Sequence, residues 1–170
     1  MTDRRVGLFA PNLPLPPARA LPWLSVLAGS LLAALPIVAT IPLLPPLGLL
    51  ILLTWRLLNR YALRRWAAAP LGFFDDLISG QPLGSAVLLW SLAFLLMELI
   101  EARLVFRDFW QDWLIAAGLL GFCLIGGRLI AVPLGAHVDT AILFQGVVGV
   151  LLFPLATRLV AWIDTRRLPA

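Results

Sequence analysis

Charged side chains inside apolar segments are the first features of this 170-residue sequence that could do chemistry. A charge in such surroundings is costly unless it is paired or serves a ligand or ion. Arg128 and Asp76 each lie four residues before the predicted outer end of a helix, about 6 Å deep. We predict that Arg128 pairs with Asp76, or with Asp75 if that helix is rotated by one position, and that the pair fixes helix packing. A ligand or ion site is the alternative.

Catalytic chemistry has little support in the sequence. Ser79, His137 and Asp139 are the residue types of a nucleophile, a base and an orienting acid, but no G-x-S-x-G turn is present. One histidine and one cysteine, Cys123, are too few for a metal site or an internal disulfide. The glycines before Arg128 lie within an apolar helix, so they form no phosphate-binding loop. We predict no catalytic residue, no metal and no cofactor.

Composition indicates which solvent surrounds these residues. The sequence is 61% hydrophobic and 13% charged, against about 45–50% and about 25% in soluble domains. So few polar residues cannot cover a soluble domain of this length. The net charge is +4, and the 13 basic residues, all arginines, are scattered between apolar runs. We therefore predict an all-α integral membrane protein that contacts the lipid bilayer and binds no nucleic acid.

The apolar runs predict six membrane spans. Residues 20–55 carry no charge and are too long for one span, and the prolines in the middle predict a hairpin. The six expected spans are about Leu21–Ile41, Pro46–Leu58, Trp66–Gly80, Leu83–Ile100, Trp113–Val132 and Ala141–Ile163. Residues 1–19 are expected to be a cytoplasmic Pro/Arg-rich tail without helix, residues 20–165 the membrane domain, and residues 166–170 a short basic cytoplasmic end.

Arginine distribution favours six spans over five. With six spans the outer loops contain no arginine, and both termini lie in the cytoplasm. Arginines and aromatic residues between Trp55 and Trp66 then form a cytoplasmic interface. We interpret Glu98, one turn before Glu101, as an acid that reaches the headgroups from the helix end. The segment Glu101–Asp112 is expected to be a short interfacial helix.

Small residues recur at helical spacing in the last two predicted spans. Ala117 with Gly121 and Cys123 with Gly127 are examples. This spacing lets helix backbones approach closely. Packing within the bundle is the favoured interpretation, and a face for a partner protein is the alternative.

A motif across the third and fourth predicted spans resembles the rod-shape-determining MreD family of bacterial inner-membrane proteins. That family has a proline that opens the second span, as Pro46 does here, followed by the pattern G-x-x-x-D-L-x-S-G-x-x-L-G. The matching residues are Gly72, Asp76, Leu77, Ser79, Gly80, Leu83 and Gly84. Leu47 and Asp75 stand where the family usually has a polar and an apolar residue, respectively.

This resemblance implies a non-enzymatic component of the cell-elongation machinery in the bacterial inner membrane. The implied partners are an MreC-like single-span protein, RodA, a class B penicillin-binding protein and the MreB filament. The implied fold is a six-helix bundle similar to the substrate-binding subunits of vitamin transporters. That fold keeps an alternative open, a transporter-like small-molecule binder with an outer cavity built from Gln145, Arg128, Asp75 and Asp76.

Overall fold

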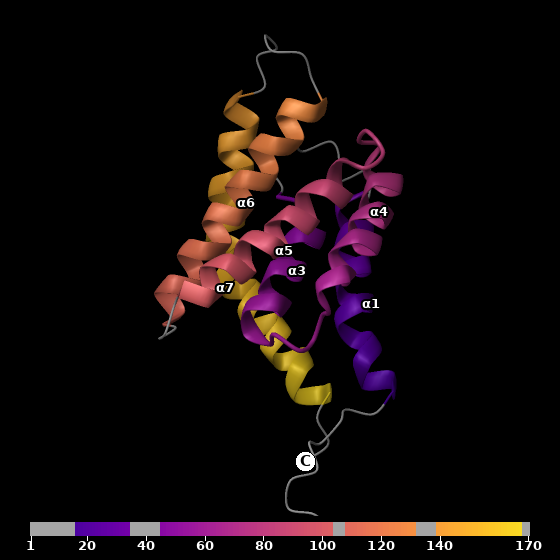
Figure 1. Ribbon diagram of the computed structural model, residues 1–170, viewed down its shortest axis with the longest axis vertical. Coiled ribbons are helices and arrows are strands. Elements are labelled where there is room, and N and C mark those ends of the chain that lie inside the picture. Colours follow the sequence, from indigo (N-terminus) through magenta and orange to yellow (C-terminus); the bar gives the residue numbers. More distant parts are fainter. Residues whose placement is uncertain (1–15, 35–44, 104–107, 132–138, 168–170) are drawn as a thin grey trace, which may run out of the picture.

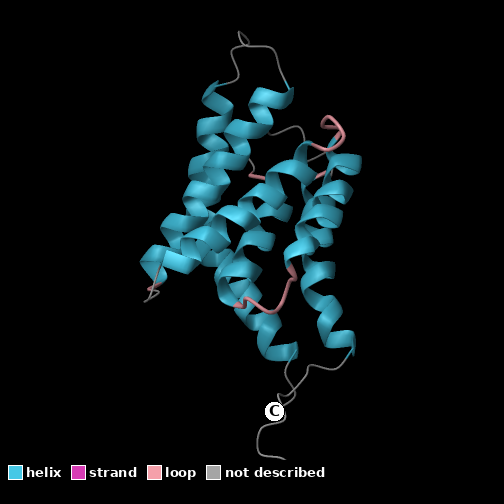
Figure 2. Ribbon diagram, in the orientation of Figure 1, coloured by secondary structure: helices cyan, strands magenta, loops and turns pink. Residues whose placement is uncertain are grey.

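The computed structural model describes residues 16–34, 45–103, 108–131 and 139–167, and every regular element in these ranges is a helix (Figure 2). The elements are α1 (Pro16–Ala33), α3 (Leu47–Leu58), the 3-10 helix η1 (Arg65–Ala67), α4 (Ala68–Ser79), α5 (Ser85–Arg103), α6 (Phe109–Ala131) and α7 (Asp139–Arg167). The α-helices run alternately up and down, so the start of α1 and the end of α7 lie toward the same end of the bundle (Figure 1). The all-α prediction is confirmed for the described part of the chain.

Among the described residues, three helices are long and apolar enough to cross a membrane. They comprise Ser85–Arg103, Phe109–Ile130 and Ile142–Arg166. Large apolar side chains on their outer surfaces are exposed, among them Leu95 of α5, Ile125 of α6 and Leu151 of α7. This exposure suits a lipid solvent and would be unfavourable in water. The other apolar helices, Ala20–Ala33 and Leu47–Leu58, are shorter, so six spans remain a prediction.

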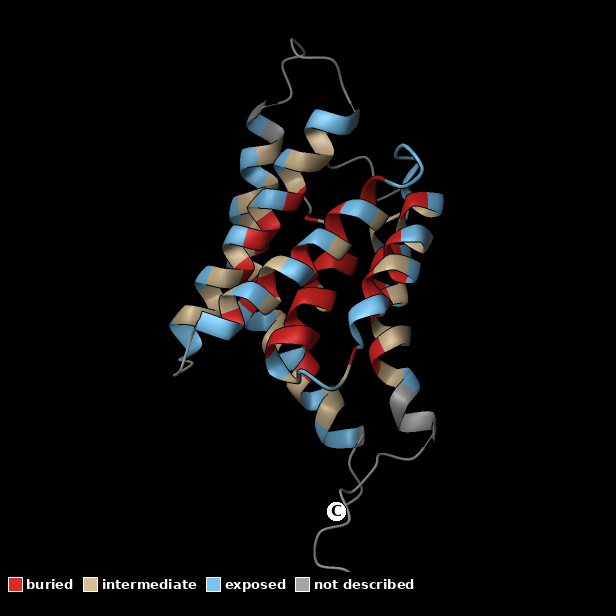
Figure 3. Ribbon diagram, viewed as in Figure 1, coloured by how far each residue is buried: buried red, intermediate tan, exposed pale blue. Residues whose placement is uncertain are grey.

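Helix α3 forms the centre of the bundle. It packs against α1, α6 and α7, and nine of its residues are buried (Figure 3). Leu52, Leu53 and Trp55 are fully enclosed. A helix that is apolar on all sides is stable only where other helices cover it. Pro46 directly precedes α3, as the sequence predicts for this helix start, because proline needs no backbone N–H donor there.

Helix α1 begins earlier than predicted. Residues 16–19 were expected to be non-helical because of their prolines, but α1 starts at Pro16. That expectation is wrong because Pro16 and Pro17 occupy the first turn, where backbone N–H groups have no intrahelical partner.

The prediction of a separate interfacial helix at Glu101–Asp112 is also wrong for the residues of this segment that the structure describes. Its first three residues continue α5 to Arg103, and its last four open α6 at Phe109; residues 104–107 lie outside the described ranges. The Asp108 carbonyl accepts the N–H groups of Gln111 and Asp112 at 3.0 and 3.1 Å, which makes Asp108 the start of α6. Likewise α7 extends to Arg167, so the basic end predicted for 166–170 is helical in part.

A proline inside α7 is accommodated by contact with α6. Pro154 has no N–H, so it cannot bond the carbonyl of Val150 one turn earlier. The indole nitrogen Nε1 of Trp113 donates to that carbonyl at 3.0 Å. The helix pair thus satisfies a backbone group that α7 alone leaves open.

Candidate functional site: an arginine–glutamate cluster and an aspartate-capped hairpin

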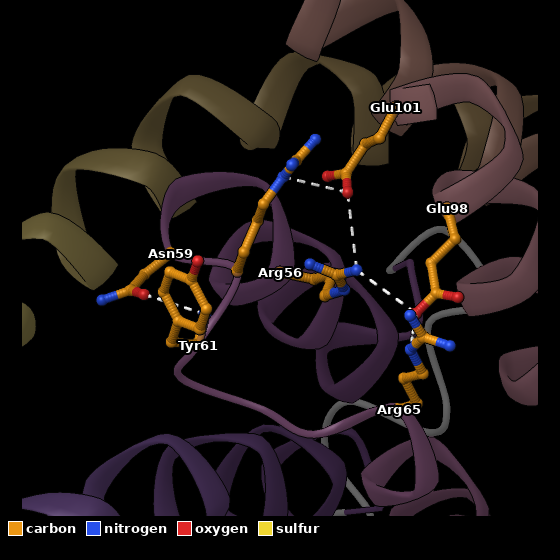
Figure 4. Close-up of polar contacts among 7 residues, drawn as sticks. Arg56, Asn59, Tyr61, Arg65, Glu98 and Glu101 are labelled. Atoms are coloured by element: carbon orange, nitrogen blue, oxygen red, sulfur yellow. Dashed lines mark hydrogen bonds and ion pairs between the residues drawn. The ribbon is translucent and has the colours of Figure 1, made fainter. Parts of the chain in front are cut away.

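An ion-pair cluster joins the end of α3 to the end of α5. Arg56 lies in the last turn of α3, and Arg60 and Arg65 follow in the connection and in η1. Glu98 and Glu101 lie three residues apart on α5, and this spacing puts them on one helix face. Figure 4 shows Arg56 and Arg65 extending toward Glu98, with Glu101 turned toward Arg56.

The cluster shares each carboxylate between two arginines. Arg56 Nη2 lies 3.5 Å from Glu98 Oε1 and 3.4 Å from Glu101 Oε2. Arg60 Nε lies 3.1 Å from the same Glu101 oxygen. Arg65 Nε lies 2.9 Å from the same Glu98 oxygen. The cluster therefore links α3, η1 and α5 through charge-assisted contacts.

Arg56 is the buried member of the cluster. Its side chain is 7% exposed, and its guanidinium carbon lies 5.9 Å from the centre of the Phe94 ring. Its Nε and Nη1 atoms are buried and have no hydrogen-bond partner. Buried guanidinium N–H groups without acceptors are unfavourable, and an anionic group that reached them would satisfy them.

A cleft of about 730 Å³ opens beside the cluster. We call it the arginine cleft; the residues that line it are Arg56, Arg60, Tyr61, Leu63, Arg64, Arg65, Trp66, Glu98, Glu101 and Ala102. Its four arginines outnumber its two glutamates. Trp66 is 59% exposed and contacts the Trp23 ring of α1, with 5.4 Å between ring centres.

Sequence reasoning missed this site. The arginines were interpreted as a cytoplasmic interface, and Glu98, one turn before Glu101, as an acid that reaches the headgroups. In the structure Glu98 is 21% exposed and pairs with Arg56 and Arg65. The available signal was the Glu98–Glu101 spacing opposite a helix that ends in arginine, but only folding showed that α3 and α5 place these charges together.

Asp76 caps the next helix instead of pairing across the bundle. Both of its carboxylate oxygens accept hydrogen bonds at the start of α5. Oδ1 accepts from Ser85 Oγ at 2.9 Å and Ala86 N at 2.8 Å, and Oδ2 accepts from Gly84 N at 2.9 Å and Val87 N at 3.4 Å. Asp76 is 2% exposed. Backbone N–H groups at a helix start and the helix dipole both stabilise a carboxylate there.

The predicted Arg128 pair is therefore wrong. Among the ion pairs of the described ranges, none joins Arg128 to Asp76 or Asp75. Helix α5 packs on both α4 and α6 and lies between them (Figure 1), which separates Asp76 from Arg128 on α6. Asp75 instead faces Ser30 of α1. The equal depth that the sequence predicted for the two residues did not make them neighbours.

The remaining motif residues shape the hairpin between α4 and α5. Gly72 lies against the α5 backbone, where a Cβ atom would meet Ala86 at 2.8 Å. Gly80 and Gly84 have φ values of 68° and 96°, a region that favours glycine. Ser79 ends α4 and is exposed. These residues build a turn and a close helix contact.

Only part of the small-residue pattern packs inside the bundle. A Cβ atom at Gly121 would meet nothing within 4 Å, and one at Gly127 would make an ordinary 3.7 Å contact with Leu89. Close contacts occur instead at Gly126, against Leu89, and at Gly149, against Leu120. Gly121 thus faces away from the other helices, contrary to the packing interpretation that the sequence favoured.

The structure does not define the geometry of the predicted group of Ser79, His137 and Asp139. His137 lies outside the described residues, so its relation to Ser79 and Asp139 is not defined. No group of three His, Cys, Asp or Glu side chains suited to a metal ion occurs in the ranges that the structure describes. Cys123 is buried and free.

Fold and composition define the class: within the ranges that the structure describes, the protein is all-helical and has three apolar helices long enough to span a membrane. No family model, curated protein or solved structure matches the chain.

Proposed function

We propose that this protein is a non-enzymatic component of the bacterial cell-elongation complex. It lies in the inner membrane with both termini in the cytoplasm. In this role it holds an MreC-like single-span protein near the enzymes of wall synthesis, RodA and a class B penicillin-binding protein, and the MreB filament. The proposal rests first on the motif resemblance of residues 72–84.

One structural observation supports using that motif as evidence. Its residues act as one unit: Asp76 caps α5, Gly72 admits the α5 backbone, and Gly80 and Gly84 form the turn. Because the motif builds architecture, it fits a platform protein better than a catalyst.

The transporter-like alternative loses one of its expected ligand groups. Its outer cavity was expected to be built from Gln145, Arg128, Asp75 and Asp76. Four donors of the α5 start already occupy both oxygens of Asp76, and α5 lies between the helices that carry Asp76 and Arg128 (Figure 1). We therefore prefer the platform function.

Gene deletion in a rod-shaped bacterium that encodes this protein tests the proposal. We expect the cells to become round while uptake of vitamin-like solutes is unchanged, and the tagged protein to co-purify with a single-span coiled-coil partner in mild detergent. If the cells stay rod-shaped but lose solute uptake, the platform function is wrong and the transporter-like function takes its place.

A substitution at Gly121, which faces away from the other helices, tests the partner interaction more directly. Gly121→Leu adds bulk where no other helix of the bundle is in contact, so the protein should accumulate normally while partner retention falls. Leu151→Trp is the control, because it adds bulk on the outer surface of a different helix, α7, where Leu151 is 67% exposed. Equal loss of the partner with both variants would argue against a defined face.

A further inference from the structure

We propose that the arginine cleft binds the phosphate of an anionic lipid headgroup. The inference is independent of the cell-elongation proposal, because it rests on the charge, burial and position of the cleft. It assigns a ligand to a site that the sequence motif does not include.

Arg56 provides the first argument. Its side chain is 93% enclosed, since 7% is exposed, and it lines the cleft. Only Nη2 takes part in its ion pairs, at 3.4 and 3.5 Å, while Nε and Nη1 have no partner. A phosphate presents several acceptor oxygens and matches the planar donor geometry of a guanidinium group.

The charge of the cleft provides the second argument. Glu98 and Glu101 neutralise two of the four lining arginines. Arg64 is exposed and makes no ion pair within the described ranges. Arg65 touches Glu98 through Nε alone, and its side chain is 85% exposed, so its remaining N–H groups can reach a ligand. The net positive charge favours an anion.

The position of the arginine cleft relative to the membrane indicates which anion it would bind. Glu101 lies two residues before the last residue of α5, a helix long enough to span a membrane. The end of such a helix lies at headgroup depth. Trp66 and Tyr61, 59% and 93% exposed, line the cleft, and Trp and Tyr prefer this interface. Leu58 and Leu99, at the ends of α3 and α5, are also exposed, which leaves apolar surface for acyl chains beside the phosphate.

Native mass spectrometry of the purified full chain in neutral detergent tests the proposal. The probes are phosphatidylglycerol, zwitterionic phosphatidylcholine and inorganic phosphate. We expect retention of phosphatidylglycerol over phosphatidylcholine, and no displacement by an equal concentration of inorganic phosphate. Arg64→Gln should weaken phosphatidylglycerol binding roughly 1.5- to fivefold, the range for one exposed charge contact, and adding Arg65→Gln should weaken it further.

Two variants complete the design. Arg158→Gln removes an exposed arginine of α7 outside the cleft and should leave binding unchanged. Arg56→Lys keeps the buried charge but removes the free guanidinium donors, so it should reduce the preference for phosphatidylglycerol; Arg64→Gln keeps the test valid if this buried variant does not fold. Equal weakening by Arg158→Gln would show general attraction to surface charge and overturn the site. Displacement by inorganic phosphate would overturn the lipid assignment.

Discussion

At the residue scale, the same type of side chain has different roles because the local backbone differs. Asp75 and Asp76 are adjacent, yet Asp75 faces Ser30 on α1 while Asp76 binds the first turn of α5. Adjacent helical residues point about 100° apart. This rotation sends one acid toward the preceding part of the bundle and the other toward the next helix.

Removal of the Asp76 carboxylate should destabilise the protein more than loss of an ordinary surface cap. Asp76→Ala leaves buried donors at the start of α5 without an acceptor, and we expect a loss of about 2–4 kcal/mol in unfolding free energy. Asp76→Asn keeps one acceptor oxygen and should lose less. Unfolding in detergent, followed by circular dichroism, measures the difference.

Asp108→Ala is the control, because Asp108 is exposed before α6 and contributes its backbone carbonyl. Equal destabilisation by Asp76→Ala and Asp108→Ala would contradict the capping role.

The buried guanidinium leads to a second prediction. Arg56→Ala leaves Glu101, which is 5% exposed, with Arg60 as its remaining ion-pair partner in the cluster. We expect Arg56→Ala to lower stability by about 3–5 kcal/mol. The double change with Glu101→Ala should lose less than the sum of the two single changes.

Arg65→Ala is the matched control within the same cluster. Its side chain is 85% exposed, so the expected loss is about 1 kcal/mol or less. Strict additivity of Arg56→Ala and Glu101→Ala would show that the two residues act independently.

At the element scale, short helices are stable here because longer ones enclose them. α3 has 12 residues and α4 has 12, and isolated helices of this length are marginal in water. α3 is enclosed by α1, α6 and α7, and α4 packs on α5 and α1. Tertiary contact, more than helix propensity, holds these two elements.

The close contact between α4 and α5 gives a third prediction. In Gly72→Ala the new methyl group would meet the Ala86 carbonyl carbon and oxygen at 2.8 Å, so the helix backbones must separate. We expect a loss of about 1–3 kcal/mol, the range for overpacking. Thermal unfolding in detergent measures it.

Gly118→Ala is the control for helix propensity. A Cβ atom there meets nothing within 4 Å, and replacing a helical glycine by alanine usually adds stability, by about 0.5–1 kcal/mol. If both alanine variants are as stable as the wild type, the close approach at Gly72 is not a constraint.

At the scale of the whole molecule, the alternating helices place the α3–η1 connection, the start of α1 and the end of α7 toward one end of the bundle (Figure 1). The turn between α4 and α5 lies toward the opposite end. This arrangement suits the predicted topology, in which the arginine-rich connection is cytoplasmic.

Cysteine labelling in intact cells tests that topology. A single cysteine at Gln81, in the exposed turn before α5, should react with a membrane-impermeant maleimide, as should one at His137. A cysteine at Tyr61, which is 93% exposed beside the arginine cleft, should react only after the cells are opened. The native Cys123 is buried, and a variant without it serves as background. Labelling of Tyr61→Cys in intact cells would show that the protein has the opposite orientation in the membrane.

Composition and apolar run length were enough to predict an all-helical membrane protein, because these signals are local and additive along the chain. They also located the start of α3 at Pro46 and the turn near Gly80. Partner choice among charges was not local. Asp76 and Arg128 were predicted to have equal depth, but α5 packs on both of their helices and lies between them (Figure 1). Arg56 instead meets Glu98 and Glu101, because the ends of α3 and α5 bring these side chains together. An ion pair depends on distance in space, and only the tertiary packing of the helices determined that distance.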